Sequence, residues 1–172
     1  NYYIFNEKNI LVRTDSHMLP DASIWEKFSN SDSFDSVFGE RIYSYTAASL
    51  PAENSTVAPS GCEFIPLRQY FAENSDDESA LAARAAGLLN WRSAYRFCPA
   101  CGAPLCDDEH LTARICTKCG RQYFPRIEPC IIVLITRGKE LLLARHRMRN
   151  QDVYTCIAGF IEIGESAEQA VV

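Results

Sequence analysis

Residues 98–120, CPACGAPLCDDEHLTARICTKCG, contain two Cys-x-x-Cys pairs, and a glycine follows each pair. Two residues between the cysteines allow a tight turn to aim both thiolates at one metal ion, and the glycine supplies the positive φ that such a turn commonly requires. Cys98 and Cys101 form the first pair, and Cys116 and Cys119 form the second. Because four sulfurs close a tetrahedral shell, the spacing predicts a structural zinc ion and leaves no position for a catalytic water.

Two other interpretations of the cysteine pairs remain open, namely redox-active dithiols and buried free thiols. Cys106 and His110 lie between the pairs, and neither has a partner at ligand spacing. Strand-like sequences at residues 112–115 and 121–124 suit a small ribbon. A segment of this size is too short to build its own hydrophobic core, so the metal would hold it together.

Alternating apolar residues predict a β-rich unit before the cysteines. Such alternation occurs at residues 3–5 and 10–12 and is typical of strands. Ser75 and Glu78 have the spacing of a capping box, and apolar residues follow at helical intervals up to Leu89. This pattern predicts a helix of about 12 residues that closes the unit.

After the ribbon, residues 129–136 have the apolar composition of a buried strand, and residues 140–144 are expected to form its hairpin partner. Residues 153–157 predict a further strand. The sequence Gly164-Glu165-Ser166 then has the pattern of a loop that enters a helix.

Charge is unevenly distributed along the chain, whose formal net charge is −5. Residues 1–90 hold six basic and thirteen acidic side chains, whereas residues 121–150 hold seven basic and two acidic ones. The acidic total argues against a general nucleic-acid binder, since phosphate neutralisation needs clustered lysine and arginine. The basic segment is either an attraction site for a phosphate-bearing ligand or a solvated face.

No apolar run approaches the ~18 residues that a membrane helix needs. The longest run, residues 130–135, has the length of a strand. The first residues also lack the basic and apolar regions of a signal peptide. We therefore expect a cytoplasmic protein that does not cross a membrane.

Residues 159–165 resemble the opening of the Nudix box, the loop-and-helix signature of the Nudix hydrolases, in which five residues separate a glycine from a glutamate. Gly159 and Glu165 have this spacing, and the seven residues after Glu165 end where the signature continues with an Arg-Glu block. The glutamates of that block bind Mg²⁺ or Mn²⁺ in this family, because carboxylates at helical spacing suit a hard cation. The resemblance therefore implies that these 172 residues are catalytically incomplete.

The order of the modules is similar to that of the NADH pyrophosphatases within the Nudix superfamily. These modules are a β-rich unit, a ribbon with four cysteines, an aromatic residue before Pro125 and the start of the Nudix box. The resemblance implies hydrolysis of the pyrophosphate of NADH or NAD to nicotinamide mononucleotide and AMP, with Mg²⁺ or Mn²⁺ as the catalytic metal. It also implies a homodimer, and it adds NAD-capped RNA as a further substrate.

The same resemblance assigns roles to individual residues. Phe124, Phe160 and Arg68 would contact the substrate, and the two phenylalanines would stack on a ring of the ligand. The alternative for both phenylalanines is a place in the core. The carbonyl of Ala158 is at the position that contacts the divalent cation, and Glu165 would brace the helix through an arginine. The other Nudix-box positions are Gly159 and Gly164.

Together these patterns predict an α+β fold with three parts. They are a β-rich N-terminal domain with a closing helix at residues 1–93, a zinc ribbon at residues 94–125, and the first part of a Nudix α/β/α sandwich at residues 126–172. Two classes of function remain, namely a dinucleotide pyrophosphatase and a binding module whose ribbon contacts nucleic acid or a protein partner. The acidic net charge and the spacing from Gly159 to Glu165 favour the enzyme.

Overall fold

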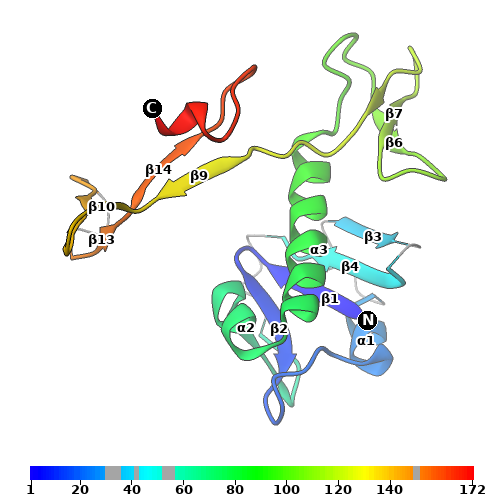
Figure 1. Ribbon diagram of the computed structural model, residues 1–172. Helices are drawn as coiled ribbons and strands as arrows, with labels where there is room; N and C mark the ends of the chain where they lie inside the picture. Colours follow the sequence, from blue (N-terminus) through cyan, green and yellow to red (C-terminus); the bar gives the residue numbers. More distant parts are fainter. Residues whose placement is uncertain (30–35, 41–42, 52–56, 149–151) are drawn as a thin grey trace. The chain divides into compact units, whose positions relative to one another are not determined.

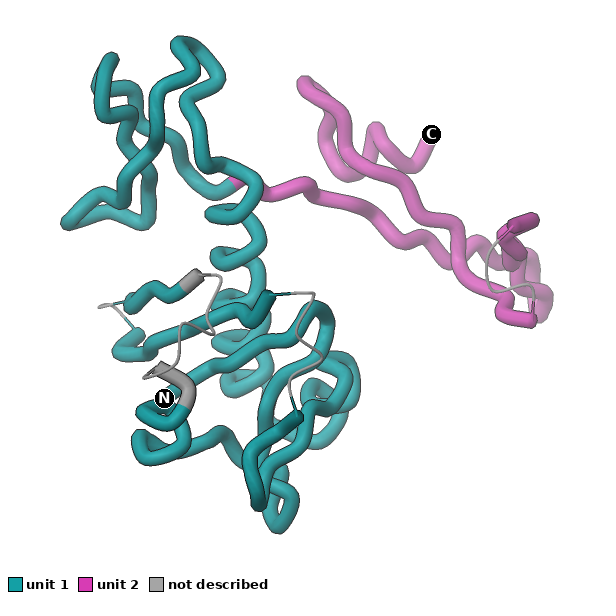
Figure 2. The backbone as a smooth tube through the Cα atoms, turned by 180° about the vertical axis from the view of Figure 1, so that it is seen from behind, with its two compact units in different colours: residues 1–125 teal, residues 126–172 magenta. Residues whose placement is uncertain are grey.

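The computed structural model describes residues 1–29, 36–40, 43–51, 57–148 and 152–172 (Figure 1). Its backbone forms two compact units, unit 1 at Asn1–Pro125 and unit 2 at Arg126–Val172 (Figure 2). Unit 1 contains the long helices and the largest sheet, whereas unit 2 contains short paired strands. The chain is therefore mixed α+β with a β-rich N-terminal sheet, which confirms the predicted fold class.

A five-stranded sheet with the order β3-β4-β1-β2-β5 forms the N-terminal part of unit 1. Strands β1 and β4 are parallel, and the other neighbouring pairs are antiparallel. A parallel pair needs a long crossover connection, and here the connection contains β2, α1 and β3. The strands are β1 (Tyr2–Asn6), β2 (Asn9–Arg13), β3 (Ser36–Glu40), β4 (Tyr45–Ser49) and β5 (Cys62–Pro66).

Helices cover both faces of this sheet. Successive side chains of a strand point to opposite faces, and accordingly Tyr3 and Phe5 lie in one buried cluster while Ile4 lies in another. The first cluster includes residues of α2 (Leu67–Glu73) and α3 (Asp76–Ala94), and the second includes Ile24 of α1 (Ala22–Ser29). The alternation predicted from the sequence thus produces an α/β/α arrangement.

Helix α3 begins with the predicted capping box. The hydroxyl of Ser75 accepts a hydrogen bond from the backbone N–H of Glu78 at 3.4 Å, and the Glu78 carboxylate accepts one from the backbone N–H of Ser75 at 3.2 Å. The helix has 19 residues, so the prediction of about 12 residues was too short. It extends to Ala94 because its last turn has tertiary partners, including an ion pair between Arg92 and Asp107.

A second sheet, with the order β6-β7-β8, follows α3 and contains the cysteine pairs. We call residues 95–125 the cysteine ribbon. Its buried cluster is small and comprises Cys98, Leu105 and Cys116. The Arg114 guanidinium donates to the carbonyl oxygen of Arg92 at 3.0 Å and to that of Leu105 at 2.6 Å, which fastens the ribbon to the end of α3. The strands are β6 (Leu105–Asp107), β7 (Arg114–Cys116) and β8 (Gln122–Tyr123).

Unit 2 consists of three antiparallel strand pairs, which are β9 with β14, β10 with β11, and β12 with β13. The predicted strand at residues 129–136 is divided between β9 and β10, and its side chains are exposed, as in Ile132 at 72%. The prediction of a buried strand was wrong, because within the described part of unit 2 only the short 3₁₀ helix at Gln169–Val171 lies against β9, and no α-helix or second sheet covers these pairs. The strands are β9 (Cys130–Val133), β10 (Ile135–Arg137), β11 (Glu140–Leu142), β12 (Ala144–Arg145), β13 (Tyr154–Thr155) and β14 (Ile157–Phe160).

The end of the chain also differs from the prediction. The residues after Gly164 form turns and the short 3₁₀ helix η1 (Gln169–Val171) in place of an α-helix. An amphipathic helix of this length gains most of its stability from packing, and the residues of η1 are not buried. In the described ranges, none of the helices has the length and apolar character needed to cross a membrane.

Candidate metal and substrate sites

The four cysteines of the two pairs come together in the cysteine ribbon. Their sulfur atoms all lie within 4.8 Å of one another. Sγ of Cys98 is 3.7 Å from Sγ of Cys119, and Sγ of Cys101 is 3.4 Å from Sγ of Cys116. Zinc–sulfur bonds of about 2.3 Å in a tetrahedron place the sulfurs about 3.8 Å apart, whereas a disulfide would bring two of them to about 2.05 Å. The spacing therefore fits a metal ion and excludes disulfides within this arrangement.

Each cysteine pair lies in a tight turn, or knuckle, that ends at a glycine. Gly102 has a φ of +72° and Gly120 a φ of +68°, which is the left-handed region that glycine enters without a steric penalty. In the second knuckle, the backbone N–H groups of Lys118 and Cys119 each lie 3.4 Å from Sγ of Cys116. These donors stabilise negative charge on the sulfur, as a metal-binding thiolate requires.

Tyr123 is a member of this site that the sequence analysis missed. Its hydroxyl oxygen lies 3.1 Å from Sγ of Cys98, and this hydrogen bond lowers the pKa of Cys98 to about 6. The backbone N–H of Ala103 also lowers the pKa of Cys101, but hydrogen bonding with Cys116 and burial outweigh it and raise that pKa to about 12. Successive side chains of a strand point to opposite faces. In the predicted strand at residues 121–124, this alternation indicates that one of the two aromatic rings, Tyr123 or Phe124, faces the cysteines.

Within the ranges that the structure describes, these cysteines form the one group of three or more potential ligand side chains. Cys106 lies outside it, with its Sγ 3.5 Å from the carbonyl oxygen of Ile115. His110 is also outside the group. A donor set made only of thiolates suits zinc, and four such donors leave no open coordination position.

The two predicted substrate residues of unit 1 lie far apart. Phe124 follows β8, and its ring is 54% exposed, so it is not a core residue of this unit. Arg68 is exposed in α2, which precedes the N-terminus of α3, whereas the cysteine ribbon follows the C-terminus of α3 (Figure 1). A helix of 19 residues is about 28 Å long, so Arg68 and Phe124 do not share a site within unit 1.

The other predicted residues lie in unit 2, on β14 and in the loop that follows it. Ala158 pairs with Ile132 across the strands, and Gly159 is its neighbour on β14. Phe160 is 71% exposed, and its ring lines a shallow depression of about 520 Å³ together with Glu165. Its exposure leaves the ring accessible to a ligand within this unit.

Gly164 and Glu165 shape the loop after β14. Gly164 has a φ of +93°, which only glycine adopts readily. The carboxylate of Glu165 accepts a hydrogen bond from the backbone N–H of Glu162 at 2.9 Å, and the N–H of Glu165 donates to the carbonyl of Glu162 at 3.1 Å. Glu165 therefore closes the loop on itself.

Comparison with known protein families gives one decisive match. Residues 2–91 match the family model of the NADH pyrophosphatase-like rudimentary NUDIX domain. The chain belongs to this family. The five-stranded sheet with α1, α2 and most of α3 is thus the rudimentary NUDIX domain, and the cysteine ribbon follows it directly.

Curated relatives of this chain carry a common name, "NAD-capped RNA hydrolase NudC". The protein of Deinococcus radiodurans is 42% identical over 118 residues, which is 66% of this chain and 42% of the relative. That of Stutzerimonas stutzeri is 41% identical over 111 residues, which is 64% of this chain and 40% of the relative. The alignments with these two relatives thus span about two fifths of their lengths.

Proposed function

We propose that this chain belongs to a Nudix hydrolase that cleaves the pyrophosphate of NADH or NAD to nicotinamide mononucleotide and AMP and also removes NAD caps from RNA. The match of residues 2–91 to the NADH pyrophosphatase-like domain carries the proposal. The names of the relatives, which are about 40% identical over some 65% of the chain, support the same substrates. By the same resemblance, we propose a cytoplasmic homodimer.

The proposed role of Cys98, Cys101, Cys116 and Cys119 is to hold one structural zinc ion. The sulfur spacing and the N–H donors to Cys116 support this role. Because the shell is closed, the zinc takes no part in the reaction. It stabilises a ribbon whose buried cluster is too small to fold alone, and Arg114 connects that ribbon to the end of α3.

The described residues do not by themselves fit a catalytic Mg²⁺ or Mn²⁺ ion. Such an ion takes oxygen ligands, and usually one or two carboxylates, in an octahedral arrangement. The described part of unit 2 contains no cluster of three potential ligand side chains, and Ala158 supplies one backbone carbonyl. We therefore propose that residues 1–172 alone do not hydrolyse NADH, and that Mg²⁺ or Mn²⁺ acts in the complete enzyme.

The proposed substrate contacts are made by aromatic rings. Phe160 and Phe124 are both exposed, and a flat exposed ring suits stacking on adenine or nicotinamide. Gly159, Gly164 and Glu165 would shape the loop beside Phe160. Arg68 is proposed as a contact to an anionic group of the substrate.

A second function, a ribbon that binds nucleic acid or a protein partner without catalysis, is favoured by the exposed basic side chains of the cysteine ribbon. One experiment separates the two functions. The product of the complete reading frame and the chain 1–172 are incubated with NADH and Mg²⁺ or Mn²⁺, and hydrolysis is followed by chromatography. We expect saturable turnover by the complete product and none by residues 1–172. A complete product that binds RNA but leaves NADH intact would establish the binding module.

A further inference from the structure

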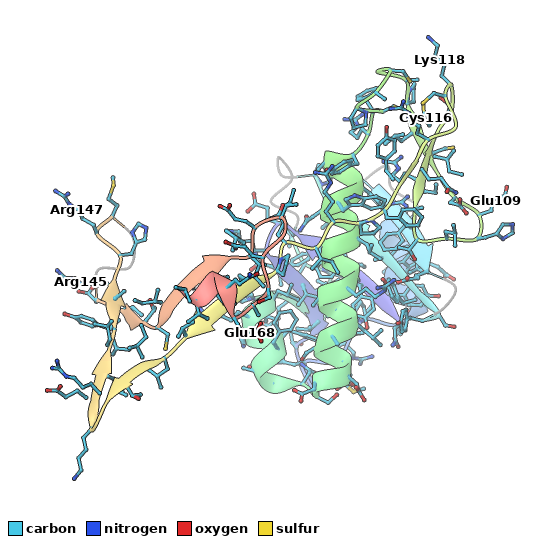
Figure 3. The ribbon with its side chains drawn as sticks, turned by 45° about the horizontal axis from the view of Figure 1, so that its top comes forward. Glu109, Cys116, Lys118, Arg145, Arg147 and Glu168 are labelled. Carbon is cyan, nitrogen blue, oxygen red and sulfur yellow. The ribbon has the colours of Figure 1, made fainter. Side chains whose placement is uncertain are left out.

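Charge is segregated within the cysteine ribbon. The three acidic residues of the ribbon, Asp107 to Glu109, lie at the end of β6 and in the loop that leads to β7. The knuckles contain no acidic residue, and they or their flanks carry exposed Arg96, Lys118 and Arg121. Lys118 projects from the cysteine end of the ribbon, and Glu109 lies at the other end (Figure 3).

Hydrogen bonds bring the two knuckles side by side. Phe97, next to Arg96, forms an isolated bridge with Pro104. The carbonyl oxygen of Pro104 accepts a hydrogen bond from the backbone N–H of Thr117 at 3.2 Å and from its hydroxyl at 3.0 Å. Lys118 follows Thr117 directly, so the basic side chains of the first and second knuckles belong to one end of the ribbon.

These basic side chains differ from three arginines of the same unit that are held by carboxylates. Arg84, Arg92 and Arg114 are ion-paired with carboxylates. In the ranges that the structure describes, no ion pair involves Arg96, Lys118 or Arg121. Their charges are therefore available to an external anion.

Two exposed aromatic rings accompany these charges. Phe97 is 57% exposed and Phe124 is 54% exposed. The guanidinium carbon of Arg96 lies 5.9 Å from the centroid of the Phe97 ring, within the range of a cation–π contact. Basic side chains that follow a phosphate backbone, combined with aromatic rings on which bases stack, are the recurring means of binding single-stranded nucleic acid.

We infer that the knuckle surface, formed by Arg96, Phe97, Lys118 and Arg121, binds the single-stranded RNA that follows an NAD cap. The inference rests on the proposed function, in which NAD-capped RNA is a substrate, and adds a site for the RNA chain. Three phosphate contacts and one stacked base make a short binding site. A site of this kind distinguishes capped RNA from the free dinucleotide, which has no RNA chain.

A structural role for the same cations makes a different prediction. A zinc ion with four thiolates carries a net charge of −2, which nearby cations partly neutralise. If this were their whole function, their removal would accelerate zinc release and leave RNA affinity unchanged. RNA affinity and zinc release are therefore measured on the same variants.

The direct test is RNA binding by the complete product at several salt concentrations. The probe is a fluorescein-labelled single-stranded RNA of 12 uridines without a cap. The triple variant Arg96→Ala/Lys118→Ala/Arg121→Ala should bind at least about tenfold more weakly, and the dependence of log K on log salt should become less steep by about 2. Phe97→Ala should weaken binding at least about fivefold through lost stacking.

A matched control carries the same change of net charge at other exposed lysines. Lys8→Ala/Lys27→Ala/Lys139→Ala should bind the probe like the wild type. Zinc content and thermal melting show that each variant is folded. A triple knuckle variant that is folded, contains zinc and binds the probe with wild-type affinity and salt dependence overturns the inference.

Kinetics separate this inference from the proposed function. For the knuckle variants, kcat/KM for NAD-capped RNA should fall about tenfold while kcat/KM for free NAD stays at the wild-type value. If the wild type and the knuckle variants cleave NAD-capped RNA equally well and free NAD equally well, the pyrophosphatase activity is supported and the RNA site is refuted. If the complete product cleaves neither substrate but its RNA affinity depends on these residues, the RNA site is supported and the pyrophosphatase activity is refuted.

Discussion

The hydroxyl oxygen of Tyr123 lies 3.1 Å from Sγ of Cys98, so a side chain of β8 holds a sulfur of the first knuckle. The contact crosses 25 positions of the sequence and joins the two ends of the cysteine ribbon. Partners of this kind fix the orientation of a metal ligand and stabilise its charged form.

Substitution Tyr123→Phe removes this hydrogen bond and keeps the ring. Side chains that hydrogen-bond to metal ligands typically contribute about 10- to 100-fold to metal affinity, so we expect zinc release to accelerate by about tenfold. The transfer of zinc to a chromogenic chelator measures the rate. Tyr154→Phe, at an exposed tyrosine of unit 2, is the control. Equal release rates for the wild type and Tyr123→Phe would show that the contact does not support the metal.

Loss of one cysteine ligand should release the metal and unfold the ribbon. Cys116→Ser removes both a sulfur of the metal group and a member of the small buried cluster. We expect less than one zinc per chain by elemental analysis and loss of amide protection in β6 to β8. Cys106→Ser changes an exposed cysteine outside the group and should keep the metal. A full complement of zinc in Cys116→Ser would refute the ligand set.

Features that depend on local spacing were predictable from the sequence. The cysteine group follows from two residues between the thiols of each pair, and the start of α3 follows from Ser75 and Glu78. Likewise, the alternation at residues 3–5 and 10–12 predicted β1 and β2. In each case the signal is a pattern of residue types at short spacing, which can be recognised without knowing the rest of the fold.

Features that depend on a partner elsewhere in the chain were not predictable. The contact between Tyr123 and Cys98 depends on the register in which β8 pairs with β7. The length of α3 depends on the ion pair that Arg92 forms with Asp107. The strand sequence at residues 129–136 contains apolar side chains, but their burial needs a covering layer. An apolar run indicates that its side chains favour burial, but it does not show which other helix or sheet covers them.

The ion pair between Arg84 and Glu40 should stabilise unit 1. Arg84 donates to both carboxylate oxygens of Glu40, at 2.8 and 2.5 Å, and the Glu40 side chain is 6% exposed. Arg84→Met removes both guanidinium donors from this buried carboxylate, which keeps a hydroxyl contact from Thr112 at 3.3 Å. We expect a loss of about 2 kcal/mol in the free energy of unfolding, less than for a fully buried pair because Arg84 is partly solvated.

Urea denaturation of the zinc-loaded chain, followed by tryptophan fluorescence, measures this loss. Arg13→Met is the matched control in the same unit, since Arg13 and Asp15 form an ion pair whose side chains are 42% and 66% exposed. Exposed pairs contribute about 0–1 kcal/mol. Equal effects of the two substitutions would contradict the importance of burial at Glu40.

His17 should make stability depend on pH. Its Nδ1 lies 2.6 Å from the Glu73 carboxylate and its Nε2 lies 3.5 Å from that of Glu63. The hydrogen bond with Glu73 raises the pKa of His17 above its ordinary value. A raised pKa in the folded state stabilises the fold below the unfolded pKa of about 6.5, and this contribution disappears as the pH rises through the folded pKa.

The test is His17→Asn, because asparagine tolerates the φ of +52° found at His17. The difference in Tm between wild type and variant should be larger at about pH 6 than at about pH 8.5. His110→Asn, at an exposed histidine, is the control. A Tm difference that stays constant between these pH values would exclude the charged form of His17 as the source of stability.

The proposed activity is tested most directly by incubating the product of the complete reading frame with NAD and Mg²⁺ or Mn²⁺ and analysing what is formed. Mass spectrometry identifies and counts the products. Cleavage of the pyrophosphate predicts nicotinamide mononucleotide and AMP in equal amounts, and the same protein should hold zinc on its four cysteines. A folded, zinc-loaded protein that leaves NAD intact, or that releases nicotinamide in place of the mononucleotide, would contradict the assignment as a dinucleotide pyrophosphatase.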